Sequence, residues 1–340
     1  MVILRDQPPH TVRSVDVIIP CHTLDRWALL LRAVHSVHGQ TTRPGRIVVS
    51  VDHNPELFER CRREWDGGDA DADAVKTEVV QSRYPGRQGS ARNTALEHCT
   101  AEIVVFLDDD AAAEPDWLRT LVAVYDDERV YAVGGAALPE YAARRPRWFP
   151  ASFDWIFGCH YDGLPEQLAP TRHLIGTTMS VRREPFVALG GFHTDDFDDM
   201  DLSHRVAHAH GAESVLYQPE AVVRHHVGAD RLTWRYFWRR CYFVNRGKAA
   251  AFADMGQAAH IGTELGFALR LSRALPGALR ALLRLDGWPL VRFLVACVGL
   301  TLAGAGFTVG RVELALGRRP PQLTVGLDRA AAAPADASDD

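Results

Sequence analysis

An apolar run that stops at three carboxylates is the feature of this sequence that most restricts its fold. Residues 103–107 read Ile-Val-Val-Phe-Leu, and Asp108, Asp109 and Asp110 follow directly. Short continuous apolar runs are typical of strands buried on both faces, and open α/β sheets bind ligands beyond the carboxyl ends of their strands. Adjacent carboxylates repel one another unless a cation shares their space. The run therefore predicts a site for Mg²⁺ or Mn²⁺, which prefer oxygen ligands and often hold phosphates as well, with a solvated acidic loop as the alternative.

Other short apolar runs alternate with helical patterns along the chain. Such alternation is typical of a doubly wound, mostly parallel α/β sheet. The expected strands lie at 15–20, 46–52, 76–81, 103–107, 130–135, 177–183, 214–218 and 222–226, and the expected helices follow Asp25 and cover 86–98 and 200–210. Residues 144–171 are expected to form an irregular segment on the surface.

A second acidic cluster lies far from the first in the sequence. Asp195, Asp196, Asp198, Asp199 and Asp201 precede or open an expected helix. The helix dipole favours carboxylates at this end, so a purely local role is one interpretation. The other interpretation is chemical, because a carboxylate can remove the proton of an attacking hydroxyl while a metal stabilises a leaving phosphate. The two clusters together would serve such a displacement if the fold brings them into one site.

Several motifs in a fixed order resemble those of family 2 glycosyltransferases with the GT-A fold. The resemblance covers residues 14–240, and its strength lies in the order and spacing of the motifs. They are Val17-Ile-Ile-Pro20, Val51-Asp52, Gly89-Ser-Ala-Arg-Asn93, Leu107-Asp-Asp-Asp110, Gly190-Gly-Phe192 and Asp198-Asp-Met-Asp-Leu202. The resemblance implies a metal-dependent enzyme that moves a sugar, with inversion, from a UDP-, GDP- or dTDP-sugar to a hydroxyl of a glycan or lipid-linked acceptor.

The resemblance also implies roles for individual residues. Asp199 would be the catalytic base with Asp198 beside it, and this chain has Asp at 198 where Glu is commoner in the family. Asp108 and Asp110 match the outer acids of the DxD motif. The implied ligands of Mn²⁺ or Mg²⁺ are Asp110, Asp108 and, as in some members, His225. Donor binding is implied for Pro20, His22, Asp52, Arg92, Asp108 and Asp109.

The C-terminal third predicts association with a membrane. Residues 289–309 carry one charge, Arg292, and at about 1.5 Å per residue they could span roughly 30 Å of bilayer. Residues 268–285 place arginines on one side and leucines on the other, as in a helix lying on anionic lipid. Spanning, re-entrant and buried arrangements of the apolar helix all stay open.

The expected organisation is an N-terminal segment (1–13), a GT-A domain (14–240), an amphipathic helical region (241–287), the apolar helix (288–311) and a disordered polar tail (312–340).

Charge and donor supply restrict the partners and the location. A formal net charge of −5 gives no reason to expect nucleic acid as a partner. Nucleotide sugars are cytosolic, so the protein is expected on the cytoplasmic side of the cell membrane, in contact with membrane lipid, or else free in the cytoplasm.

A polyprenyl-phosphate sugar transferase is the nearest alternative activity, although it would need no strong base. A non-catalytic nucleotide- or glycan-binding module is the alternative from another class, and the presence of both acidic clusters argues against it.

Overall fold

The computed structural model describes residues 13–65, 75–83, 88–194, 197–254, 271–273, 275–277, 279–281 and 284–318. These residues form two compact units. The first takes in the described residues up to 136 together with 166–223, and the second takes in 137–165 and the described residues from 224 onward. Asp195, Asp196, nearly all of the expected N-terminal segment and most of the expected tail lie outside the described residues.

A mixed sheet gives the chain its α/β class. Its strand order is β3-β2-β1-β4-β8-β6-β9-β5, and β7 pairs with β9. Strands β3, β2, β1 and β4 are parallel, whereas β8 joins β4 in the antiparallel direction. The strands are β1 (Val15–Cys21), β2 (Arg46–Val51), β3 (Lys76–Gln81), β4 (Ile103–Leu107), β5 (Ala111–Ala113), β6 (Ala132–Tyr141), β7 (Ala169–Pro170), β8 (Thr178–Arg182) and β9 (Val215–Val227).

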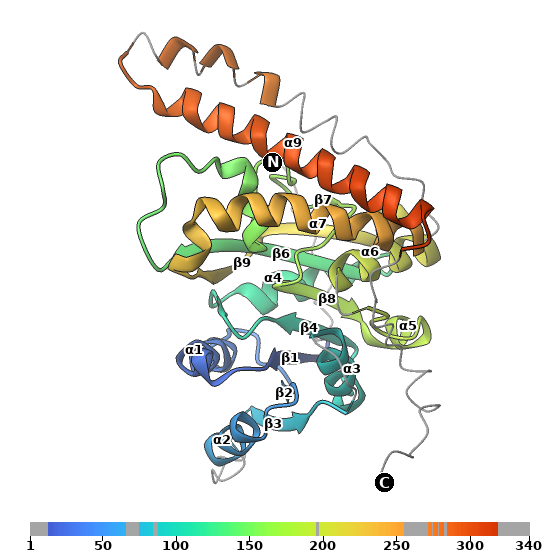
Figure 1. Cartoon of the computed structure of the whole chain (residues 1–340). Coiled ribbons are helices and arrows are strands. Elements are labelled where there is room, and N and C mark those ends of the chain that lie inside the picture. Colours follow the sequence, from blue (N-terminus) through green and yellow to red (C-terminus); the bar gives the residue numbers. More distant parts are fainter. Residues whose placement is uncertain are drawn as a thin grey trace, which may run out of the picture. The chain divides into compact units, whose positions relative to one another are not determined.

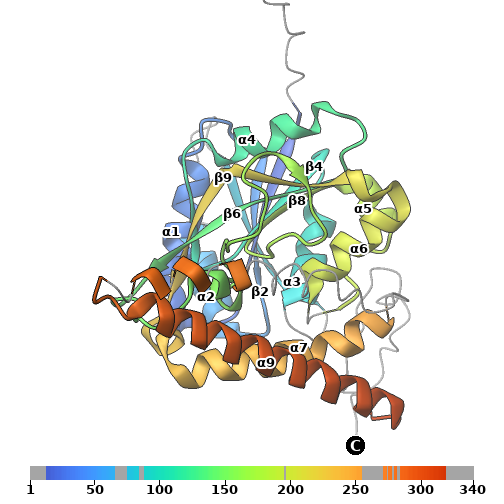
Figure 2. The same ribbon diagram turned by 90° about the horizontal axis from the view of Figure 1, so that it is seen from above.

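Helices of the first unit cover both faces of its parallel strands. Helices α1 and α3 lie on opposite sides of β1 and β2 (Figures 1 and 2). Helix α1 buries Leu30, Ala33, Val34 and Val37, the spacing of one helical face. The helices of this unit are η1 (Leu24–Arg26), α1 (Trp27–His38), α2 (Pro55–Trp65), α3 (Gln88–His98), α4 (Trp117–Ala123), η2 (Val124–Asp126), α5 (Arg183–Ala188), α6 (Asp198–His210) and η4 (Ala212–Ser214).

The register of the parallel strands brings their carboxyl ends to one edge. Cys21 at the end of β1 pairs with Val51 at the end of β2, and Ile18 pairs with Phe106 near the end of β4. Residues that directly follow these strands therefore share that edge, which is where ligands bind in open α/β sheets. Asp52 and Asp108 are such residues, as the sequence predicted.

Two expectations about the later part of the chain were wrong. Residues 214–218 and 222–226 are not separate strands, because β9 runs through Pro219 without a turn. Residues 144–171 are not wholly an irregular surface segment, because η3 (Ala151–Phe157) forms within them. Phe153 and Phe157 are buried with Phe149. The ring of Phe149 stacks on the ring of Phe157, with ring centroids 4.9 Å apart.

The second unit joins these aromatic rings to two long helices. A buried cluster contains Phe149, Phe153, Phe157, Phe237, Cys241 and Ala296. Helix α7 (Trp234–Asp254) follows η5 (Ala229–Leu232) and lies alongside α9 (Trp288–Ala315), as both Figures 1 and 2 show. Helix α9 has 28 residues with a mean hydropathy of 1.9 over its most apolar window, so its length and composition would allow it to cross a membrane.

Candidate active site

The ends of β1 and β2 form one corner of the candidate site. Asp52 follows β2, and its Oδ1 lies 2.6 Å from Nδ1 of His53. Asn54 donates a hydrogen bond of 3.1 Å to the backbone carbonyl of His22. Pro20 is buried within β1, whereas the His22 side chain is exposed. The first loop and Asp52 therefore border the same edge, and their contact with a nucleotide stays a prediction.

Two of the three aspartates after β4 form ion pairs with one arginine, Arg26. Nη1 of Arg26 lies 2.9 Å from an oxygen of Asp109 and 3.0 Å from an oxygen of Asp110. Asp109 is 4% exposed and Asp110 is 6% exposed. Burial, followed by the charge of Asp110, raises the pKa of Asp109 to about 7, although Arg26 opposes that shift. The second carboxylate oxygen of Asp109 has no hydrogen-bond partner among the described residues.

This crowding fits a divalent cation. Asp108 and Asp110 each place a carboxylate oxygen within 4.8 Å of the other, a separation that one ion between them could bridge. Oxygen donors of this kind suit Mg²⁺ or Mn²⁺. A buried carboxylate oxygen without a partner and an acid with a raised pKa both indicate that more positive charge is needed here than Arg26 supplies. The residues present therefore fit the metal that the sequence predicted.

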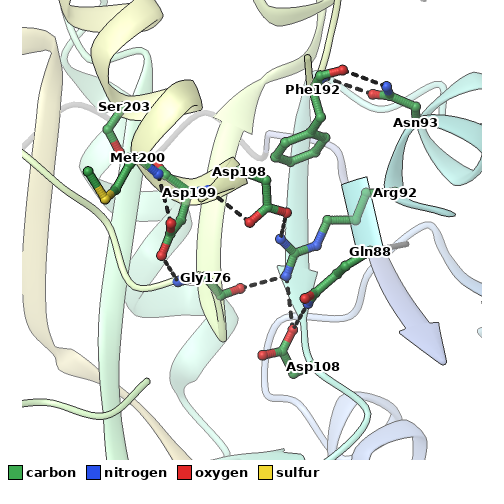
Figure 3. Close-up of polar contacts among 10 residues, drawn as sticks. All are labelled: Gln88, Arg92, Asn93, Asp108, Gly176, Phe192, Asp198, Asp199, Met200 and Ser203. Carbon is green, nitrogen blue, oxygen red and sulfur yellow. Dashed lines mark hydrogen bonds and ion pairs between the residues drawn. The ribbon is translucent and has the colours of Figure 1, made fainter. Parts of the chain in front are cut away.

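Arg92 connects the two acidic clusters. Its side chain is fully buried on α3. One end of the guanidinium donates to Asp198, and Nη2 donates to Asp108 at 2.9 Å and to the carbonyl of Gly176 at 2.8 Å (Figure 3). The rings of Phe106 and Phe192 lie 5.7 and 5.6 Å from its central carbon. Acids that are 90 residues apart in the sequence thus share one buried cation.

Small and polar residues of α3 allow Arg92 to reach this position. Gly89, Ser90 and Ala91 are all buried, so this turn of the helix packs closely against the sheet. The next residue, Asn93, exchanges two hydrogen bonds of 2.8 Å with the backbone of Phe192, also visible in Figure 3. These bonds tie α3 to the segment that leads into α6, which begins at the second acidic cluster.

The second cluster lies at the N-terminus of α6. Phe197 adopts a left-handed backbone conformation with φ of 62° immediately before the helix. Burial raises the pKa of Asp198 to about 7, and the nearby charges of Asp199 and Asp108 act in the same direction while Arg92 opposes them. The two oxygens of Asp199 accept backbone hydrogen bonds from Gly176 at 3.2 Å and from Met200 at 2.8 Å (Figure 3). The Asp199 carboxylate is therefore held in one orientation and is half-buried.

His225 lies on the part of β9 that belongs to the second unit. Its side chain is buried, and its Nδ1 lies 3.3 Å from the sulfur of Cys159, also in the second unit. A hydrogen bond at Nδ1 can fix which ring nitrogen is free to bind a metal. Its role as a ligand stays a prediction.

Arg26, Gln88 and Gly176 belong to the site although the sequence analysis did not select them. Gln88 donates to Asp108 at 2.6 Å, beside the bond from Arg92. Arg26 ends η1, which follows β1. A basic residue at the same sheet edge as three acids is the signal that could have identified it. Gly176 contributes only backbone atoms, so its side chain offered no signal. A Cβ at this position would come within 3.4 Å of the Asp199 carboxylate.

Comparisons with known proteins agree with this fold. Residues 16–190 match the model of the family described as glycosyl transferase family 2. A glucosyl-dolichyl phosphate glucuronosyltransferase of Haloferax volcanii is 32% identical over 243 residues, covering 66% of this chain and 75% of that protein. The O-antigen chain rhamnosyltransferase WbaN of Salmonella anatum is 26% identical over 199 residues, covering 56% of this chain and 59% of WbaN.

A solved structure shares the fold. The mannosyltransferase PcManGT of Pyrobaculum calidifontis, in complex with GDP-Man and Mn²⁺, superposes with a TM-score of 0.54 at 21% identity. The match covers 91% of this chain and 80% of that one. The predicted GT-A fold is thereby confirmed.

Proposed function

This chain belongs to glycosyl transferase family 2, and we propose that it transfers a sugar, with a divalent metal and with inversion, from a nucleoside diphosphate sugar to a hydroxyl of a lipid-linked glycan. The observation that carries the proposal is the pairing of Arg92 with both Asp108 and Asp198. The donor phosphates and the attacking hydroxyl must lie on opposite sides of one sugar. The acidic cluster that serves the phosphates and the acidic cluster that serves the hydroxyl must therefore share one site.

On the donor side, Asp108 and Asp110 would hold the metal, with His225 as the proposed third ligand. A bound divalent ion supplies Lewis-acid stabilisation of the charge that develops on the leaving diphosphate. We choose His225 because the family resemblance implies a histidine at this place as a further metal ligand in some members. We assign the nucleoside to the corner formed by Asp52 and the loop of Pro20 and His22.

On the acceptor side, we assign Asp199 as the general base. The hydrogen bonds from Gly176 and Met200 orient its carboxylate before the acceptor arrives. It takes the proton of the acceptor hydroxyl as that oxygen bonds to the anomeric carbon, and the bond from this carbon to the diphosphate oxygen breaks on the opposite side. Asp198, which faces Arg92, acts as a positioning residue.

A lipid-linked acceptor and a membrane location are supported from two directions. The relative from Haloferax volcanii is named for action on a glucosyl-dolichyl phosphate. In this chain, α9 is long and apolar enough to associate with a membrane. We assign the protein to the cytoplasmic face because nucleotide sugars are made in the cytosol.

The test measures release of nucleoside diphosphate by the full-length protein. UDP-, GDP- and dTDP-sugars are offered in turn with Mn²⁺, the ion held by the mannosyltransferase of the same fold. One donor class should give release that a glycosylated polyprenyl lipid stimulates and that EDTA abolishes. Glu184→Gln, an exposed acid on α5, is the matched control for variants of the site and should keep full activity. Stimulation by bare polyprenyl phosphate alone would redirect the assignment to the phosphate-acceptor reaction, and absence of release with every donor would contradict the proposal.

A further inference from the structure

We propose that the second unit binds an anionic membrane through α9 lying in the plane of the interface, and that α9 does not span the bilayer. This mode of attachment deepens the membrane location proposed above and rests on it, but it is independent of the transfer chemistry. It follows from the direction in which α7 and α9 run, from the charges that accompany them, and from the outer face of α9.

Helices α7 and α9 are parallel and touch backbone to backbone. At two glycines of α9, Gly306 and Gly310, an added Cβ would clash with backbone atoms of Tyr242 and Arg246 on α7. At Gly299 the added Cβ would clash with the ring of Phe153 on η3 and, next, with the ring of Phe237 on α7. Residue numbers rise together along both helices, so the helices run in the same direction. Beyond the last glycine, Glu313 accepts two hydrogen bonds from Arg246, of 2.7 and 2.5 Å, and holds the far end of the pair together.

Parallel packing is incompatible with a single span. If α9 crossed the bilayer, α7 would cross beside it in the same direction, and residues 255–287 would have to return through the hydrocarbon. Charged side chains at the bilayer centre are strongly disfavoured. Helix α7 carries Arg235, Arg239, Arg240, Arg246 and Lys248, and the returning segment carries Arg270, Arg273, Arg280 and Arg284. Helices α7 and α9 are therefore excluded together from the hydrocarbon core, although α9 by itself is apolar enough to enter it.

The outer face of α9 is apolar. Its exposed large side chains are Val291, Leu294, Val298, Val309 and Val312. At 100° per residue they fall within about 60° of one another around the helix. Thr301 and Thr308 are also exposed on α9, and their hydroxyls donate to the backbone carbonyls of Cys297 and Gly304 within the helix. An apolar stripe of this kind buries well among lipid acyl chains near the headgroups.

Charge complementarity identifies the partner as anionic lipid. Exposed arginines lie before, on and after α9, namely Arg273, Arg280, Arg284, Arg292, Arg311 and Arg318. The acids in the described part of the same stretch are Asp286 and Glu313, and Glu313 is paired with Arg246. At the start of α9 the guanidinium of Arg147 lies 4.7 Å from the ring of Trp288, and aromatic rings near cationic groups are typical of the membrane interface.

Vesicle flotation of the full-length protein tests the attachment. Binding to vesicles containing phosphatidylglycerol should exceed binding to phosphatidylcholine vesicles at least tenfold at low salt and should weaken as salt rises, because the arginines are screened. The double variant Leu294→Glu, Val312→Glu should bind about 10²-fold more weakly, since both apolar contacts are lost. Leu168→Glu with Val187→Glu is the matched control, because these exposed apolar residues lie in the first unit.

Depth measurements separate an in-plane helix from a span. Environment-sensitive probes are attached at Leu294→Cys or Val312→Cys in a Cys297→Ala background, and lipid-borne quenchers report their depth. The two positions lie about 27 Å apart along the helix axis. An in-plane helix puts both probes at the same shallow depth, about 5–10 Å below the headgroups. Probes near opposite headgroup layers would overturn the in-plane arrangement while leaving the membrane location intact.

Two further outcomes would contradict the membrane attachment as well as the in-plane arrangement of α9. Absence of flotation with any vesicle would remove the membrane location itself, although nucleoside diphosphate release could still support the transfer activity. A stable dimer in lipid-free solution that the Leu294→Glu, Val312→Glu variant dissociates, without binding to vesicles, would assign the apolar face to a second copy of the chain.

Discussion

Replacement of Arg92 by Met should show that the two acidic clusters depend on one buried cation. The guanidinium is fully buried and serves Asp108, Asp198 and the carbonyl of Gly176 together. Methionine fills much of the same volume but leaves both carboxylates without this partner. Removing one member of a buried ion pair typically costs about 3–5 kcal/mol, because an uncompensated charge stays inside the protein. A loss of that size is a large part of the stability of an ordinary domain.

The loss should depend on Asp198 and on pH. The pKa of Asp198 is raised to about 7, so its carboxyl is mostly charged at pH 8 and mostly protonated at pH 5.5. Arg92→Met should therefore be more costly at pH 8 than at pH 5.5. In an Asp198→Asn background the cost should shrink and lose most of its pH dependence. We expect a coupling energy of about 2–3 kcal/mol at pH 8, near the top of the range for residues in contact.

Urea unfolding of the four proteins of this double-mutant cycle, at both pH values, measures the coupling. Arg205→Met is the matched control. Arg205 pairs with Asp201 on α6 at 2.8 Å, and among the described residues it forms no hydrogen bond or ion pair with Asp198 or Asp108. Arg205→Met should lower stability without changing donor affinity, whereas Arg92→Met should change both. Additive losses at both pH values would refute the idea that Arg92 and Asp198 act as a pair.

Three other changes probe different parts of the molecule. Asp199→Asn should lower the turnover number by about 10²–10⁴-fold with little change in donor affinity, measured by single-turnover kinetics and by calorimetry; normal turnover would exclude Asp199 as the base. Gly306→Ala should destabilise the protein in thermal unfolding because its Cβ would clash with Tyr242, while Gly304→Ala, with open space around it, should stabilise by up to about 1 kcal/mol. Burial raises the pKa of Asp154 to about 6, so the folded state binds its proton more tightly than the unfolded state does. Asp154 should therefore withdraw up to about 3 kcal/mol of stability as pH rises from 4 to 7, and Asp154→Asn should flatten that part of the unfolding curve.

The sequence predicted the sheet edge at which Asp52 and Asp108 lie because the necessary signals are local. A run such as Ile103–Leu107 shows its burial through its own composition, and the acid after it must lie at the strand end. Parallel register then brings the ends of β1, β2 and β4 together without further information from the sequence. Helix α2 was not predicted, because it buries only Leu57 and Cys61 and its apolar periodicity is sparse.

The pairing of Arg92 with both acidic clusters could not be predicted in the same way. An arginine on a helix normally faces solvent, and what buries Arg92 is a partner 106 residues later in the chain, Asp198. The contact between Arg92 and the nucleotide that the resemblance implied stays a prediction, and the structure adds the contacts of Arg92 with Asp108, Asp198 and Gly176. The parallel direction of α7 and α9 was equally hidden, because hydropathy describes each helix by itself and the glycine contacts appear only when both are placed.

The electrostatics of the site argue that the metal binds before the donor. Five carboxylates gather there, from Asp108, Asp109, Asp110, Asp198 and Asp199. Arg26 and Arg92 form ion pairs with the first four of them. A nucleoside diphosphate adds negative charge, so its approach to the metal-free protein is opposed. A divalent ion would be the largest local charge and would reverse that opposition. In calorimetry Mn²⁺ should bind alone, the donor should bind only with Mn²⁺ present, and the donor should raise Mn²⁺ affinity by the same factor, since binding free energies are reciprocal. Equal donor affinity in EDTA would show that Arg26 and Arg92 already neutralise the site, and the metal would then have to act on the chemical step alone.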